Sequence, residues 1–187
     1  MFPIFEQGEG RGIGHIFDGF IERFDEICQK HLADGRARSF AFILYDFRDM
    51  AFRTLLKEHD VFTKLDRLSG RNLSVFYLHS ADRRTAGRFN TEFLEKLELQ
   101  SGVELPCVVF FNHTEQGIKD VQVAELNSRN PVHAFQELYT AIDNYIKNPE
   151  IKIPSDFKAL KIVVSSAKFI AKEAFRAALK EGFGRIF

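Results

Sequence analysis

Three short apolar runs constrain the fold of this chain most. They are SFAFILYDF at 39–47, NLSVFYLHS at 72–80 and PCVVFFNH at 106–113. Each run is too apolar to alternate between a buried and an exposed face, so we interpret each as a strand buried on both faces. The segment 118–126 alternates in hydropathy and follows a turn at 113–117, which predicts an antiparallel hairpin with the third run.

The segments around these strands have helical periodicity, with apolar residues recurring every three or four positions. Helices are therefore predicted from 16 to about 34, within 49–68 as one long or two short helices, at 91–99 and at 131–147. Gly35 and Gly70 stand where C-cap glycines are expected, and Pro131 fits the first turn of its helix. Two strands joined through a helix should be parallel.

Composition limits the classes of function. A chain of 187 residues can bury a self-sufficient core, and its 21 phenylalanines without a tryptophan indicate an aromatic-rich one. The formal net charge is zero, so we expect no nucleic-acid partner. The start of the chain lacks the charged and apolar regions of a signal peptide, and no apolar run is long enough to span a membrane, so the expected location is the cytoplasm.

The region after residue 156 differs in charge from the rest. From Asp156 to the end there are seven basic and three acidic residues, a net charge of +4, and 156–181 is predicted as a long amphipathic helix with a lysine-rich stripe. One interpretation is a helix docked on its own domain or forming a homodimer. The other is an interaction helix for a partner groove or an anionic membrane surface. Its alanines favour close packing on protein over insertion into lipid.

The order of elements resembles the thioredoxin-like fold over about residues 16–147. The resemblance depends on LPCVVFFN at 105–112, followed by a turn and IKDVQVAEL at 118–126. It implies an α/β fold, a four-stranded mixed sheet flanked by helices, here with an extra N-terminal helix and a long C-terminal helix. The expected organisation is a flexible lead at 1–15, the thioredoxin-like domain at 16–148, and a linker with the basic helix at 149–187.

Pro106 has a special place in this resemblance. A proline is tolerated at the first residue of a strand, where it removes no essential ladder bond, and it can also be cis in a turn. In the thioredoxin-like family the proline at this place is cis and faces the active site. The resemblance therefore implies a cis Leu105–Pro106 bond.

The thiol chemistry of the family is missing where it should occur. Thioredoxin-like oxidoreductases carry Cys-x-x-Cys after the first central strand, at a helix N-terminus that lowers a thiol pKa. The matching segment here, YDFRDMAFRTLLKE at 45–58, has no cysteine. We interpret Cys28 and Cys107 as apolar core residues; the alternative for Cys107 is a redox-sensitive thiol near the vacated site.

Other sequence patterns that could indicate a catalytic or binding site are incomplete. GEGRGIG at 8–14 lacks the spacing and context of a phosphate-binding loop, so it is taken as part of the flexible lead. The six histidines form no zinc-binding pattern, and no metal or cofactor is expected. His79 and Asp82 are close enough to pair, as many surface neighbours are.

Arginines gather after the first two apolar runs. Because ligands favour the carboxyl ends of parallel strands, we predict a partner-binding edge there, and arginine suits carboxylate or phosphate groups. The predicted site residues are Arg48, Arg53, Arg83, Arg84, Arg88, Leu105 and Pro106. Asp46, Asp49 and Asp82 lie among them, so a mixed solvated rim is the alternative.

The predicted function is a non-catalytic thioredoxin-like module that binds a protein or peptide by β-pairing at the edge near Leu105 and Pro106. One alternative is an enzyme on the same fold that binds glutathione or another anion without dithiol chemistry. Another is a membrane-surface protein attached through the C-terminal basic helix.

Overall fold

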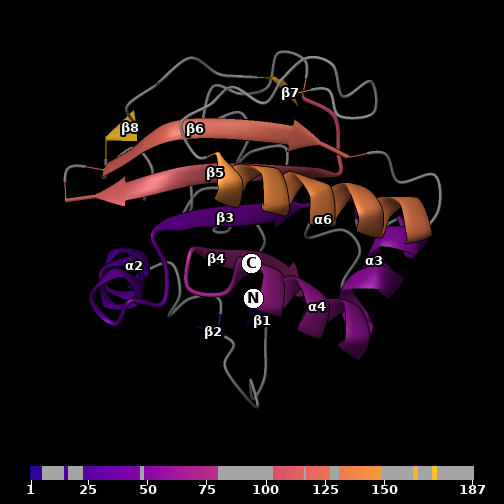
Figure 1. The fold of residues 1–187 in the computed structure, drawn as a ribbon, viewed down its shortest axis with the longest axis horizontal. Coiled ribbons are helices and arrows are strands. Elements are labelled where there is room, and N and C mark those ends of the chain that lie inside the picture. Colours follow the sequence, from indigo (N-terminus) through magenta and orange to yellow (C-terminus); the bar gives the residue numbers. More distant parts are fainter. Residues whose placement is uncertain are drawn as a thin grey trace, which may run out of the picture.

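The structure is a computed structural model that describes residues 1–5, 15–16, 23–46, 49–79, 103–115, 117–126, 131–148, 162–163 and 170–171. Its elements in chain order are β1 (Phe2–Phe5), β2 (His15–Ile16), α2 (Phe24–Ala33), β3 (Ser39–Leu44), α3 (Met50–Lys57), α4 (His59–Ser69), β4 (Leu73–His79), β5 (Cys107–Thr114), β6 (Gly117–Glu125), α6 (Pro131–Lys147), β7 (Ile162–Val163) and β8 (Ile170–Ala171). These strands form one mixed sheet flanked by helices, an α/β arrangement (Figure 1).

The sheet has the order β2-β1-β4-β3-β5-β6-β7, and β8 also pairs with β6. β3 runs parallel to β4 and antiparallel to β5, while β5 and β6 form an antiparallel hairpin. Both predicted pairings are therefore confirmed. β3 is central, and all six of its residues are buried, as its apolar run predicted.

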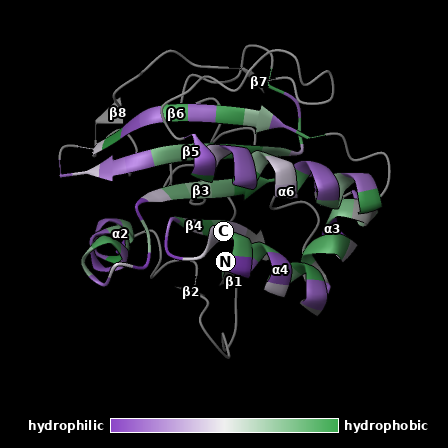
Figure 2. Ribbon diagram, in the orientation of Figure 1, coloured by the Kyte–Doolittle hydropathy of each residue, from purple (hydrophilic) through white to green (hydrophobic). Residues whose placement is uncertain are grey.

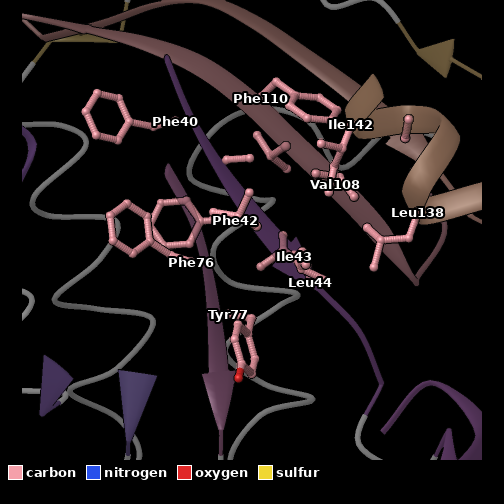
Figure 3. Close-up of a cluster of buried hydrophobic side chains, with 14 of the residues drawn as sticks. Phe40, Phe42, Ile43, Leu44, Phe76, Tyr77, Val108, Phe110, Leu138 and Ile142 are labelled. Atoms are coloured by element: carbon pink, nitrogen blue, oxygen red, sulfur yellow. The ribbon is translucent and has the colours of Figure 1, made fainter. Parts of the chain in front are cut away.

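Helices cover both faces of the sheet. α3, α4 and α6 contact one another, and Tyr145 of α6 stacks on Phe110 of β5 with ring centroids 4.3 Å apart. Figure 3 shows Leu138 and Ile142 of α6 beside Val108 of the same strand. α4 and α6 carry both hydrophilic and hydrophobic segments (Figure 2), as expected of helices with one buried side.

The opposite face of β3 meets α2 through an aromatic cluster. The ring of Phe24 on α2 lies 6.1 Å from that of Phe42 and 6.2 Å from that of Phe111. Phe40 and Phe76 complete the cluster, and Figure 3 shows Phe76 alongside Phe42. Each such pair contributes about 0.5–1.5 kcal/mol beyond the burial of its area. The phenylalanine-rich core predicted from composition is therefore present.

Two buried hydrogen bonds join α2 to the sheet. Nδ1 of His31 lies 2.8 Å from Oγ of Ser74 on β4. Nε2 of His113 on β5 lies 3.1 Å from Oδ1 of Asp25. Because polar groups taken out of water need partners, these contacts fix α2 against β4 and β5 more specifically than ring packing alone.

The ends of the helices follow local rules. Gly35 after α2 and Gly70 after α4 have φ values of 64° and 51°, a region that glycine adopts without a steric penalty. The two-helix alternative for 49–68 is the correct one, because Glu58 has φ −71° and ψ 119° and separates α3 from α4.

The N-terminal prediction was wrong in two respects. Phe2–Phe5, expected to belong to a flexible lead, form β1 and pair in parallel with β4. His15–Ile16 form β2, whereas a helix was expected from Ile16, and α2 begins only at Phe24. The Phe2 ring lies 4.7 Å from His31 and 5.8 Å from Phe76. Such tertiary contacts cannot be read from a four-residue segment.

The predicted sheet of four strands was too small, and the C-terminal prediction also needs correction. Ile162–Val163 and Ile170–Ala171, placed in a long helix by their periodicity, pair antiparallel with β6 as β7 and β8. Without them this side of β6 would present unpaired backbone groups. The remaining residues of the predicted helix, and the helix predicted at 91–99, lie outside the described residues. No helix in the described part of the chain is long and apolar enough to cross a membrane.

Candidate functional site

The candidate site lies where β3 ends, α3 begins and β5 starts. Figure 1 shows these three ends at the same side of the molecule. Leu44, the last residue of β3, pairs with Cys107, the first residue of β5. Extending this antiparallel register by one residue brings Tyr45 beside Pro106. We call the region formed by residues 45–46, 49–53 and 103–106, together with Tyr77 of β4 near Tyr45, the Pro106 edge.

The first turn of α3 is fixed by a helix cap. The Asp49 carboxylate accepts a hydrogen bond of 3.0 Å from the amide of Phe52. Such a cap typically contributes about 1 kcal/mol to helix stability. Met50, the first residue of the helix, is 54% exposed. The helix therefore presents an exposed apolar thioether at its start.

Arg53 lies near the buried phenol of Tyr45, which in turn lies near the buried phenol of Tyr77 on β4. Burial raises the pKa of Tyr45, the nearby Tyr77 adds to the rise, and the positive charge of Arg53 opposes it. Burial also raises the pKa of Tyr77, to about 12. Figure 3 shows the Tyr77 hydroxyl directed away from the aromatic cluster. Both tyrosines are therefore neutral hydrogen-bonding groups at physiological pH.

The segment before β5 is held at two points. The amide of Glu104 donates to Oε1 of Glu125 at 3.0 Å, and the amide of Leu126 donates to the carbonyl oxygen of Pro106 at 2.8 Å. The Leu105–Pro106 bond between them is cis. Leu105 is half-buried and packs on the core, yet its amide and carbonyl take part in no backbone hydrogen bond among the described residues.

Both cysteines are buried in the core, as predicted. Burial raises the pKa of Cys107, and the nearby Glu125 carboxylate raises it further. Burial raises the pKa of Cys28 as well, with a contribution from Asp25. A thiol must ionise to act as a nucleophile, so neither group is prepared for attack in the folded protein.

Of the predicted site residues, Arg53, Leu105 and Pro106 belong to the described part of the chain. The register of β3 and β5 brings the Pro106 segment to the end from which α3 and Arg53 follow. Arg48, Arg83, Arg84 and Arg88 lie outside the described residues. His79 is the last residue of β4, and its suggested partner Asp82 also lies outside them.

Sequence reasoning missed Tyr45, Tyr77 and Glu125. Both tyrosines stand in apolar runs and were counted only as strand residues. Glu125 ends an alternating strand, where an acidic residue is ordinarily exposed, but its side chain is buried and anchors Glu104. Its one signal in the sequence is its position among the apolar residues Val123, Ala124 and Leu126.

Among the residues with described placement, no group of three or more His, Cys, Asp and Glu side chains is arranged to hold a metal ion. The Pro106 edge instead offers one guanidinium, two neutral phenols and the peptide groups of Leu105, a set that suits binding by hydrogen bonds and charge. Comparisons with family models, with curated proteins and with solved structures found no match for this chain.

Proposed function

We propose that this protein is a non-catalytic thioredoxin-like module that binds an extended peptide at the Pro106 edge. The observation that carries the proposal is Leu105. Its neighbours Glu104 and Pro106 are hydrogen-bonded to the end of β6, while its own peptide groups have no backbone hydrogen bond to any residue that the structure describes. A rigidly held strand start with available amide and carbonyl groups suits an incoming extended segment, which gains affinity from main-chain hydrogen bonds.

The arrangement of the sheet supports the thioredoxin-like part of the proposal. A thioredoxin-like domain is expected to have a parallel βαβ unit followed by an antiparallel hairpin, and β3, β4, β5 and β6 have these relations. α2 on one face, with α3, α4 and α6 on the other, suits the same fold.

The non-catalytic part is supported by the chemistry of the edge. Dithiol exchange needs an attacking thiolate and a second thiol that resolves the mixed disulfide. Residues 45–58 supply neither. Both cysteines of the chain are fully buried, and their thiol pKa values are raised by that burial.

The test begins with a displayed library of random peptides selected against the folded protein. Selected peptides are then titrated into the isotopically labelled protein while backbone amide resonances are followed. We expect the largest shifts at 103–107 and slowed exchange of the Leu105 amide in the complex. In parallel, an insulin-reduction assay should show no turnover above a protein-free blank.

Tyr139→Ala on α6 is the matched control, because this exposed side chain lies on a helix outside the Pro106 edge. It should leave the affinity of the selected peptides unchanged. Two results would overturn the proposal: peptides whose shifts centre on α6 or α4 rather than on 103–107, or insulin turnover that disappears in Cys107→Ala.

A further inference from the structure

Arg53 is a half-buried cation without a partner in the described part of the chain. Its Nε is shielded from water and has no hydrogen-bond acceptor among the residues whose placement is described. The ion pairs among the described residues include Arg23 with Glu26 and Arg36 with Asp34, but none with Arg53. A charged donor in this situation is unusual, because a shielded polar group without a partner costs roughly 1–3 kcal/mol, and more when it is charged.

Asp49, the N-cap residue of α3, does not neutralise the charge of Arg53. Asp49 is four residues before Arg53, a spacing at which helical side chains commonly pair. Its carboxylate instead caps α3 through the amide of Phe52. The Glu125 carboxylate, at the other side of the edge, is buried against the amide of Glu104. Asp49 and Glu125 thus each have a structural role, and the structure describes no ion pair between Arg53 and either of them.

The groups around Arg53 favour an anion over a second cation or an apolar side chain. The phenol of Tyr45 near Arg53, and that of Tyr77 near Tyr45, are neutral, and both lie in surroundings from which water is largely excluded. A hydroxyl can donate to a carboxylate, and a carboxylate can accept two parallel hydrogen bonds from a guanidinium. In such partly desolvated surroundings a charge-assisted contact is stronger than at an open surface.

We infer that the peptide bound at the Pro106 edge carries an acidic side chain, Asp or Glu, whose carboxylate is received by the Arg53 guanidinium. This inference rests on the proposed function, since it assigns the chemical class of the segment that pairs with Leu105. The main-chain contacts at Leu105 are independent of sequence, and Arg53 supplies the selectivity. The apolar Met50, three residues before Arg53 and hence on a neighbouring part of the helix surface, provides contact area beside it.

The experiment compares the peptides selected from the random library by the wild-type protein, by Arg53→Gln and by Arg67→Gln. Arg67, in the last turn of α4, is exposed and serves as the matched control for loss of one positive charge. We expect Asp and Glu to be enriched at one fixed peptide position with the wild type and with Arg67→Gln, and not with Arg53→Gln. For the best acidic peptide, Arg53→Gln should weaken binding about 10- to 100-fold.

A second comparison separates a direct contact from an effect on folding. Replacing the enriched Asp or Glu of the peptide by Asn or Gln should weaken binding to the wild type by a similar factor. The same replacement should have little effect on binding to Arg53→Gln, because the two changes remove one interaction. Free glutamate and inorganic phosphate serve as competitors; we expect either to displace the acidic peptide only at concentrations far above the peptide Kd.

The outcomes distinguish the inference from the proposed function. If peptides bind with shifts at 103–107 but show no acidic enrichment, or lose equal affinity with Arg53→Gln and Arg67→Gln, the assignment to Arg53 is wrong and the binding module stands. If no peptide binds at 103–107, the proposed function itself fails. If phosphate binds at Arg53 as tightly as the acidic peptide does, the site is for a small anion and the inference is overturned.

Discussion

Tyr77 couples the stability of the fold to alkaline pH. Burial raises its pKa from the ordinary value of 10.0 to about 12, so the folded state keeps the phenol proton more tightly than the unfolded state does. The resulting stabilisation is fully present below pH 10 and is lost as pH rises to about 12. Within this window the free energy of unfolding should fall by about 1.4 kcal/mol per pH unit from this phenol alone.

Urea denaturation at a series of pH values from 9 to 11 measures this dependence. Tyr77→Phe keeps the ring in place and removes the titrating hydroxyl, so its stability should decline less steeply above pH 10. The buried thiols titrate in both proteins, so the difference between the two slopes reports the Tyr77 hydroxyl together with its effect on the pKa of Tyr45. Equal slopes for the two proteins would show that Tyr77 is not shielded as described.

At the scale of single residues, the sequence predicted the end of β3 and the start of β5 better than it predicted which side chains are buried there. The apolar runs located the carboxyl end of β3, and the absence of cysteine from 45–58 was visible directly. Leu105, Pro106 and Arg53 were named because strand order places them at one edge. Tyr45, Tyr77 and Glu125 were missed because their burial depends on α3 and on the β5–β6 hairpin, contacts that no local pattern records.

Among the elements, α2 depends on two polar contacts with the sheet. The imidazole of His113 and the carboxylate of Asp25 are both buried, with side-chain exposures of 2% and 7%. Replacing His113 by Ala leaves a cavity and takes one partner from a buried carboxylate. We expect His113→Ala to reduce the free energy of unfolding by about 2–4 kcal/mol, measured by urea denaturation at neutral pH.

An exposed pair provides the comparison for this prediction. Lys147 contacts Asp143 at 2.6 Å on α6, but the lysine side chain is 66% exposed. Lys147→Ala should therefore lower the free energy of unfolding by no more than about 0.5 kcal/mol. In a double-mutant cycle, His113 and Asp25 should show a coupling energy of about 1–3 kcal/mol. A coupling near zero would mean that α2 is held by its aromatic rings alone.

The elements that were predicted correctly are those whose own pattern decides their state. β3 is buried on both faces and reads as a continuous apolar run, and α6 is a long amphipathic segment with proline in its first turn. β1 has four residues and includes a proline, and it is a strand because Phe2 packs on His31 and Phe76. β7 and β8 have helical spacing in sequence but pair with β6, so tertiary pairing outweighed local periodicity there.

For the whole molecule, the position of β3 predicts an order of local stability. β3 pairs with β4 on one side and β5 on the other, beneath helices on both faces. Its amides should exchange with solvent only when the entire domain unfolds, so their exchange should report the global free energy of unfolding. β2, at one end of the sheet, should exchange through smaller local openings.

Native-state hydrogen exchange followed by mass spectrometry tests this order. Low concentrations of urea should accelerate amide exchange in β3 as steeply as they promote global unfolding. Exchange in β2 should depend on urea concentration much less. If peptides from β3 exchange as early as those from β2, the aromatic cluster around Phe42 does not form the most stable part of the fold.

The distribution of aromatic residues also decides how this molecule interacts with light. The chain has four tyrosines and no tryptophan, so its near-ultraviolet absorption and emission above the phenylalanine bands come from phenols alone. Two of the four, Tyr45 and Tyr77, are buried at the Pro106 edge, and Tyr145 is buried between α6 and β5. Occupancy of the edge should therefore alter the tyrosine spectrum without any added label. A single Met50→Trp substitution, at an exposed helix start, would create the one indole in the protein, and its emission would come from that edge and from nowhere else.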